Sequence, residues 1–176
     1  MELDLIRIGE KLISREKIIR GIDRILQLRA QGLSQQEAAN RLQLDRTFIS
    51  RLEGLGEVRK GSRLALIGFP IANAEELRTV AEEAGVEFIF VLDDRQRWDF
   101  VTTRSGASLF NDVLDLVARL NNFDTIIFLG SDRRLQWAEA LWDNVVGIVI
   151  GPSPIKEDKY VDPRMIADLI ESIRNR

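Results

Sequence analysis

The sequence predicts an α/β protein with an entirely helical N-terminal part and a larger C-terminal part built on a parallel sheet. Apolar residues recur at helical spacing through residues 1–56. Beyond residue 63, continuous apolar runs alternate with amphipathic stretches, which is typical of strands joined by helices. A stretch with three glycines separates the two patterns. We therefore expect domains at 1–56 and 63–176, joined by a linker at 57–62.

The composition limits the chemistry that the chain can perform. Its 176 residues include no cysteine and no histidine, so disulfides and thiolate sites are excluded, and the commonest zinc ligand and general base is missing. We expect no catalytic residues, no metal site and no cofactor, and therefore no enzyme. No apolar run approaches membrane-spanning length, and the first residues lack a signal-peptide pattern. These features predict a soluble, cytoplasmic protein without a membrane partner.

Two helices are expected at the start of the chain. Apolar residues between Leu3 and Ile13 follow a helical pattern, which predicts a helix over residues 2–13. Ser14 is placed to cap a longer second helix, and Gly32 stands where such a helix commonly ends. The helix over 2–13 is either part of the bundle core or a contact between two copies of the chain.

Residues 33–53 carry the most specific pattern. Ser34 followed by Glu37 forms a capping box, in which each side chain accepts a hydrogen bond from a free N–H at a helix start. The short helix that follows would bury Ala38, Ala39 and Leu42. Asp45 is placed to cap a second helix, which would bury Phe48, Ile49 and Leu52. Two short helices that touch at a small residue describe a helix-turn-helix.

Three parts of this stretch carry a resemblance to a known family: the Ser-Gln-Gln-Glu-Ala-Ala opening, the Arg41-Leu42 pair and the segment 46–53. The stretch resembles the phage-repressor and Cro-type (XRE-like) family of DNA-binding domains. The chain departs from that family at Gln43, where the turn usually carries glycine, and a left-handed glutamine costs roughly 1 kcal/mol relative to glycine. The resemblance implies double-stranded DNA as the partner, with a recognition helix at about 45–53 in the major groove. The DNA-binding residues expected from it are Ser34, Gln35, Arg46, Thr47, Ser50 and Arg51.

After the linker, four apolar runs alternate with helix signals. The expected strands span 64–69, 86–92, 125–129 and 145–150, and the expected helices span 74–84, 105–120, 133–143 and 162–173. Continuous apolar runs indicate strands that are buried on both faces. Strands alternating with helices imply parallel pairing through right-handed crossovers. We expect a four-stranded, three-layer Rossmann-like or flavodoxin-like domain with the strands in the order 2-1-3-4.

Ligands of such sheets bind beside the carboxyl ends of the strands. Short residues follow these strands, and the helix N-termini beyond them would attract an anion. The expected effector-binding residues are Gly68, Asn73, Asp93, Gly130, Ser131 and Asp132. The alternative is that the polar residues only cap helices and the glycines only make turns. Asp93, Asp94 and Asp132 also offer the oxygen ligands that Mg²⁺ prefers, but aspartates are common at strand ends and we predict no metal site.

The charges divide between the two parts of the chain. Residues 1–63 contain 13 Lys and Arg against 9 Asp and Glu, whereas residues 64–176 contain 12 against 19. A basic head on an acidic body suits a head that contacts phosphate. We expect a transcription regulator whose α/β domain binds a small-molecule effector. The alternatives are an α/β domain that only dimerises or holds a protein partner, and an enzyme domain with a DNA-binding head.

A homodimer is expected because one helix-turn-helix contacts only a few base pairs. The candidate dimer surfaces are the helix predicted at 2–13 and the α/β-domain helices around Trp137 and Trp142. The α/β domain is favoured because its exposed helical layer is larger.

Overall fold

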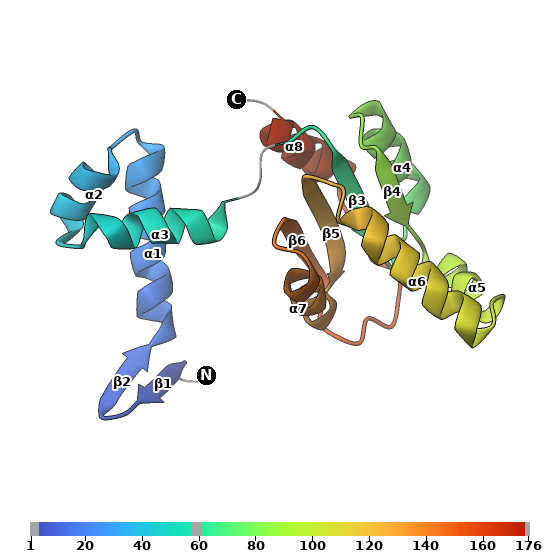
Figure 1. Ribbon diagram of the computed structural model, residues 1–176, viewed down its shortest axis with the longest axis horizontal. Helices are drawn as coiled ribbons and strands as arrows, with labels where there is room; N and C mark the ends of the chain where they lie inside the picture. The colour runs from blue at the N-terminus through green and yellow to red at the C-terminus, as the bar shows by residue number, and fades with distance from the viewer. Residues whose placement is uncertain (1–3, 58–60, 175–176) are drawn as a thin grey trace. The chain divides into compact units, whose positions relative to one another are not determined.

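The computed structural model describes residues 4–57 and 61–174 and divides into two compact units, with the boundary between Glu57 and Val58 (Figure 1). The boundary falls at the start of the linker expected at 57–62, of which residues 58–60 lie outside the described residues. Within the described ranges, no helix has the length and apolar character that crossing a membrane requires.

The N-terminal unit begins with an antiparallel hairpin, so the prediction of a helix over 2–13, and of an entirely helical unit, was wrong for these residues. Strands β1 (Leu5–Ile8) and β2 (Lys11–Ser14) pair Ile8 with Lys11, which leaves Gly9 and Glu10 as a two-residue turn. Gly9 has φ +59°, the left-handed backbone that hairpin turns of this length need. Residues 2 and 3 lie outside the described residues.

Three helices follow the hairpin: α1 (Arg15–Ala30), α2 (Gln35–Leu42) and α3 (Arg46–Gly56). Ser14 caps α1 as expected, because its hydroxyl accepts a hydrogen bond from the Lys17 N–H. Helix α3 continues three residues past the expected end at 53, so Gly54 and Gly56 are helical. The buried core of the unit consists of Ile25, Leu28, Ala38, Ala39 and Ile49. A core of this size buries little apolar surface, and small units of this kind are only marginally stable.

The C-terminal unit contains a four-stranded parallel sheet in the order β4-β3-β5-β6, which confirms the predicted order. Its strands are β3 (Leu64–Gly68), β4 (Phe88–Val91), β5 (Thr125–Ser131) and β6 (Val145–Gly151). Its helices are α4 (Ala74–Glu83), α5 (Asp94–Thr102), α6 (Gly106–Leu120), α7 (Asp132–Leu141) and α8 (Pro163–Arg174). Helix α5 was not predicted, because its residues are polar and show little amphipathic periodicity.

Helices cover both faces of this sheet (Figure 1). Alternate residues of β3 point to opposite faces: Leu64 and Leu66 pack with α4 and α8, and Ala65 and Ile67 pack with α6 and α7. The two resulting cores lie on either side of the sheet, as a three-layer arrangement requires.

Asn73 holds the start of α4 against the segment that precedes α8. The side chain makes no capping bond to α4, so the alternative of a capping role does not hold for Asn73. Instead its Nδ2 donates to the Val161 carbonyl at 2.8 Å, and its Oδ1 accepts from the Val161 N–H at 3.1 Å. Nδ2 also donates to Glu76 Oε2 at 3.0 Å. Asn73 therefore joins two segments that lie 88 residues apart in the chain.

Replacing Asn73 with alanine should lower the free energy of unfolding of the C-terminal unit by about 1–3 kcal/mol, because both polar groups of Val161 lose their partner. Urea unfolding followed by tryptophan fluorescence measures this, since Trp98, Trp137 and Trp142 all belong to this unit. Asn111→Ala, at an exposed position of α6, is the control and should change the unfolding free energy little. Equal stability of the two variants would contradict this role of Asn73.

Candidate functional site

Side-chain caps define the starts of both α2 and α3. Ser34 Oγ accepts from the Glu37 N–H at 3.2 Å, and Glu37 Oε2 accepts from the Ser34 N–H at 2.7 Å, which completes the expected capping box. These hydrogen bonds hold the pKa of Glu37 below its usual value. Asp45 Oδ1 accepts from the Thr47 N–H at 2.5 Å and so caps α3. This bond lowers the pKa of Asp45.

Gln43 occupies the left-handed region, with φ 55° and ψ 42°, at the end of α2. The next residue, Leu44, donates its N–H to the Ala39 carbonyl at 2.9 Å. This six-to-one hydrogen bond is the one that commonly closes a helix through a left-handed residue. Gln43 therefore adopts the backbone for which glycine is the usual choice, and α3 follows after only two further residues.

One face of α3 is exposed and polar. Its members, all of them residues expected from the sequence to contact DNA, are Arg46, Thr47, Ser50 and Arg51. Ile49 is fully buried and Leu52 partly buried on the other side of the helix. Phe48 was expected in the core, but it is 48% exposed because it lies at the edge of the buried face. Within the described residues, neither Arg46 nor Arg51 forms an ion pair.

The start of α2 lies beside this face. Ser34, Gln35 and Arg46 line a shallow polar depression together with Arg29 and Gln36. The N-terminus of α2 opens there, and helix N-termini favour anions. The Gln35 side chain already donates from Nε2 to Glu53 Oε2 at 2.7 Å, so it is held in place by α3.

Glu53 ties the three helices of the unit together. Its carboxylate accepts from Arg29 Nε on α1 and from Gln35 Nε2 on α2. Arg29 also donates to the Leu33 carbonyl, in the connection between α1 and α2. The hydrogen bonds from Arg29 and then from Gln35, together with the charge of Arg29, hold the pKa of Glu53 below its usual value of 4.5. Glu53 therefore fixes the orientation of α3, which carries the exposed polar face.

The expected effector residues of the C-terminal unit take part in structural contacts. Asp93 caps α5 by accepting from the Gln96 N–H at 2.6 Å, and the buried Ser131 caps α7 by accepting from the Arg134 N–H. Asp132 Oδ1 accepts from the Ser153 N–H at 2.8 Å.

The two glycines among these residues lie in close packing. A Cβ at Gly68 would lie 3.0 Å from Leu129 Cβ, and one at Gly130 would lie 2.6 Å from the Phe128 ring. The carboxylates of Asp93, Asp94 and Asp132 do not form a cluster that could hold a metal in the described part of the chain.

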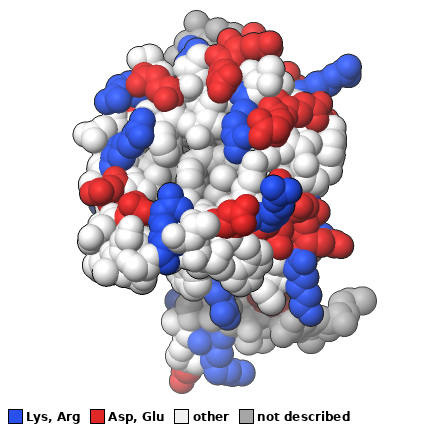
Figure 2. All heavy atoms as spheres, turned by 90° about the vertical axis from the view of Figure 1, so that its right-hand side faces the viewer, with Lys and Arg blue, Asp and Glu red and all other residues white. Residues whose placement is uncertain are grey.

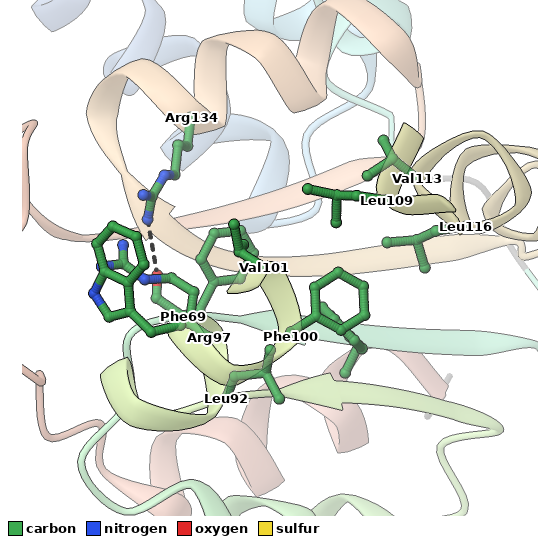
Figure 3. A pocket seen from close by; sticks show the side chains of 11 residues that line it. Phe69, Leu92, Arg97, Phe100, Val101, Leu109, Val113, Leu116 and Arg134 are labelled. Atoms are coloured by element: carbon green, nitrogen blue, oxygen red, sulfur yellow. Dashed lines mark hydrogen bonds between the residues drawn. The ribbon is translucent and has the colours of Figure 1, made fainter. Parts of the chain in front are cut away.

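A cavity of about 540 Å³ lies beside these positions (Figure 3). It is lined by the residues Phe69, Phe90, Leu92, Arg97, Trp98, Phe100, Val101, Leu109, Val113, Leu116 and Arg134. None of the six expected effector residues is among them, although Phe69 follows Gly68 and Leu92 precedes Asp93 directly. The cavity therefore lies near the strand ends, but its lining side chains belong to residues that neighbour the expected ones.

The face shown in Figure 2 carries basic and acidic side chains side by side, with uncharged side chains between them. No single sign of charge dominates this face. A surface of this kind does not have the electrostatic character of a phosphate-binding patch.

Comparison with protein-family models, curated proteins and solved structures finds no match for this chain.

Replacing Glu53 with alanine should destabilise the N-terminal unit by about 1–3 kcal/mol at neutral pH, because Arg29 and Gln35 lose their shared acceptor. A carboxyl group whose pKa is lowered by folding stabilises the folded state fully when the pH is above its pKa in the unfolded chain. That stabilisation is lost as the pH falls through the pKa in the folded state. The difference in unfolding free energy between the wild type and Glu53→Ala should therefore shrink below pH 4.5.

Hydrogen exchange of the α2 and α3 amides, measured at neutral pH and in acid, follows this unit separately. Glu10→Ala, in the exposed hairpin turn, is the control and should leave the exchange rates unchanged. If the difference in exchange rates between the wild type and Glu53→Ala stays constant down to acid pH, the charge of the carboxylate does not stabilise this unit.

Proposed function

We propose that this protein is a sequence-specific DNA-binding transcription regulator that inserts α3 into the major groove. The observation that carries the proposal is the pairing of two capped helices, α2 and α3, with a polar exposed face on the second. The caps at Ser34 and Asp45 and the Glu53 contacts support a rigid presentation of that face. Pre-organised side chains lose less conformational entropy when they bind.

The exposed side chains suit two kinds of contact with DNA. Arg46 and Arg51 can each donate two hydrogen bonds to the guanine O6 and N7 atoms, and Thr47 and Ser50 can contact bases or phosphates. The backbone N–H groups at the start of α2, near Gln35, suit a phosphate. Gln35 holds Glu53 while it faces the depression, so its side chain links the phosphate position to α3.

Replacing Arg46 or Arg51 with alanine should weaken binding to a selected operator by roughly 1–3 kcal/mol and relax its sequence preference. These variants lose hydrogen bonds to base edges, which form with the operator but not with random DNA. The measurement is the affinity for the operator and for random duplex DNA at two salt concentrations.

Arg20→Ala is the matched control, because Arg20 lies on α1 and pairs with Glu16 at 2.9 Å. It should leave the ratio of operator to random affinity unchanged. If Arg46→Ala and Arg51→Ala weaken both DNAs equally, neither arginine contacts bases in the way proposed here.

We also propose that the protein is a homodimer in which the hairpin forms the contact between copies. The β1–β2 pairing puts Ile6, Ile8 and Ile13 on one face of the hairpin, with Lys11 at the end. Ile6 is 47% exposed and Ile8 is 62% exposed within a single copy. An isolated two-stranded hairpin is marginal in water, so an apolar face of this kind favours a partner. Exposed apolar side chains of α6 and α7, including Phe110 and Trp137, form the alternative surface.

Light scattering of the full chain at tens of micromolar should give the mass of a dimer, and Ile8→Glu should give a monomer. The introduced carboxylate would have to be buried in the contact, which is costly. Arg7→Ala, on the opposite face of the same strand, should remain dimeric. A monomeric wild type would contradict the homodimer, and a dimeric Ile8→Glu variant would move the contact to the α/β unit.

A further inference from the structure

The cavity of the C-terminal unit has apolar walls contributed by separate segments. Phe69 follows β3, Phe90 and Leu92 come from β4 and its end, and α5 contributes Phe100. Helix α6 supplies the side chains Leu109, Val113 and Leu116. The cavity volume of about 540 Å³ lies within the roughly 300–1,000 Å³ typical of small-molecule sites.

The cavity remains open because α6 covers the sheet over only part of its length. Leu120, at the end of α6, is fully buried, whereas Val113 is 44% exposed. The first part of the helix therefore presents apolar side chains to a cavity instead of closing a core. Apolar surface left open in this way favours an occupant with an apolar body.

Two arginines add positive charge to this otherwise apolar site. Arg134 reaches from the first turn of α7 toward Phe69 and Arg97 (Figure 3). Its Nη1 donates to the Phe69 carbonyl at 3.3 Å, and its guanidinium lies 4.7 Å from the centre of the Phe69 ring. Arg97 forms an ion pair with Asp94, but Arg134 has no acidic partner within the described residues. Burial and the nearby charge of Arg97 lower the pKa of Arg134.

We propose that this cavity binds an amphipathic organic carboxylate, with its apolar body against α5 and α6 and its carboxylate on Arg134. A planar guanidinium matches a carboxylate through two parallel hydrogen bonds, and the remaining donors of Arg134 suit this geometry. A neutral apolar ligand would leave the charge of Arg134 uncompensated in the site. A phosphate-rich ligand would place several charges in a site whose walls are mainly aromatic and aliphatic, and the second arginine of the lining, Arg97, is already paired with Asp94.

The ligand is tested without DNA, so the outcome does not depend on the function proposed above. The probes are 2-naphthoate and 2-naphthalenemethanol, which share a ring system and differ in charge. Isothermal titration of the full chain, without DNA, should show naphthoate binding about tenfold more tightly than the alcohol, because only the carboxylate gains charge-assisted hydrogen bonds.

Arg134→Gln should remove this preference, with naphthoate weakened about tenfold and the alcohol changed little. Arg133→Gln is the matched control, because the neighbouring Arg133 is exposed and does not line the cavity. Val113→Trp, at a half-exposed position of the wall, should fill the site and weaken both probes while the helix content of the chain is retained.

Equal affinity of the two probes would overturn the proposal, as would equal effects of Arg134→Gln and Arg133→Gln. Undetectable naphthoate binding at about 1 mM would also overturn it. If naphthoate fails to bind and Val113→Trp converts a dimer into a monomer, the apolar surface of this cavity is a contact with a second copy of the chain.

Discussion

The N–H groups in the first turn of a helix have no partner inside that helix, and both units of this protein depend on how these groups are satisfied. Most of the helices begin at a serine or aspartate whose side chain accepts one of these hydrogen bonds. The capping residues are Ser14, Ser34, Asp45, Asp93, Ser105 and Ser131. In the N-terminal unit the Asp45 cap, two residues after the left-handed Gln43, sets where α3 begins. In the C-terminal unit, Asp93 and Ser131 at the ends of strands β4 and β5 cap α5 and α7.

The same constraint explains how much of the fold could be predicted. Capping residues and apolar periodicity are local signals, so the starts of α1, α2, α3, α6 and α8 followed from them. The order of the four parallel strands followed from the alternation of strands with helices and from the Rossmann-like arrangement expected for it. The hairpin did not, because Leu5, Ile6, Ile8 and Leu12 satisfy a helical spacing as well as a strand pairing. The turn at Gly9 decides between the two. Helix α5 has a capping box from Asp93 to Gln96, which was the available signal for it.

The exposed face of α3 and the cavity of the C-terminal unit also differ in how far the sequence could predict them. The exposed face of α3 could be predicted because its members lie on one short helix, where spacing alone places them together. The cavity could not, because Phe69, Arg97 and Arg134 come from three segments that only the folded sheet brings together. An arginine three residues after a strand-end serine was the weak sequence signal for it. The caps and apolar spacing at 33–53 predicted the two short helices, and the contacts of Glu53 join them to α1.

Recognition of DNA through α3 can be tested by selection from random duplexes. The full chain is mixed with a library of random duplexes, and the bound fraction is recovered and sequenced over several rounds. We expect enrichment of a two-fold symmetric motif whose half-sites are about one helical turn apart. The double variant Arg46→Ala and Arg51→Ala should enrich no such motif. If the wild-type chain recovers duplexes without any sequence preference, α3 does not recognise DNA in the way proposed.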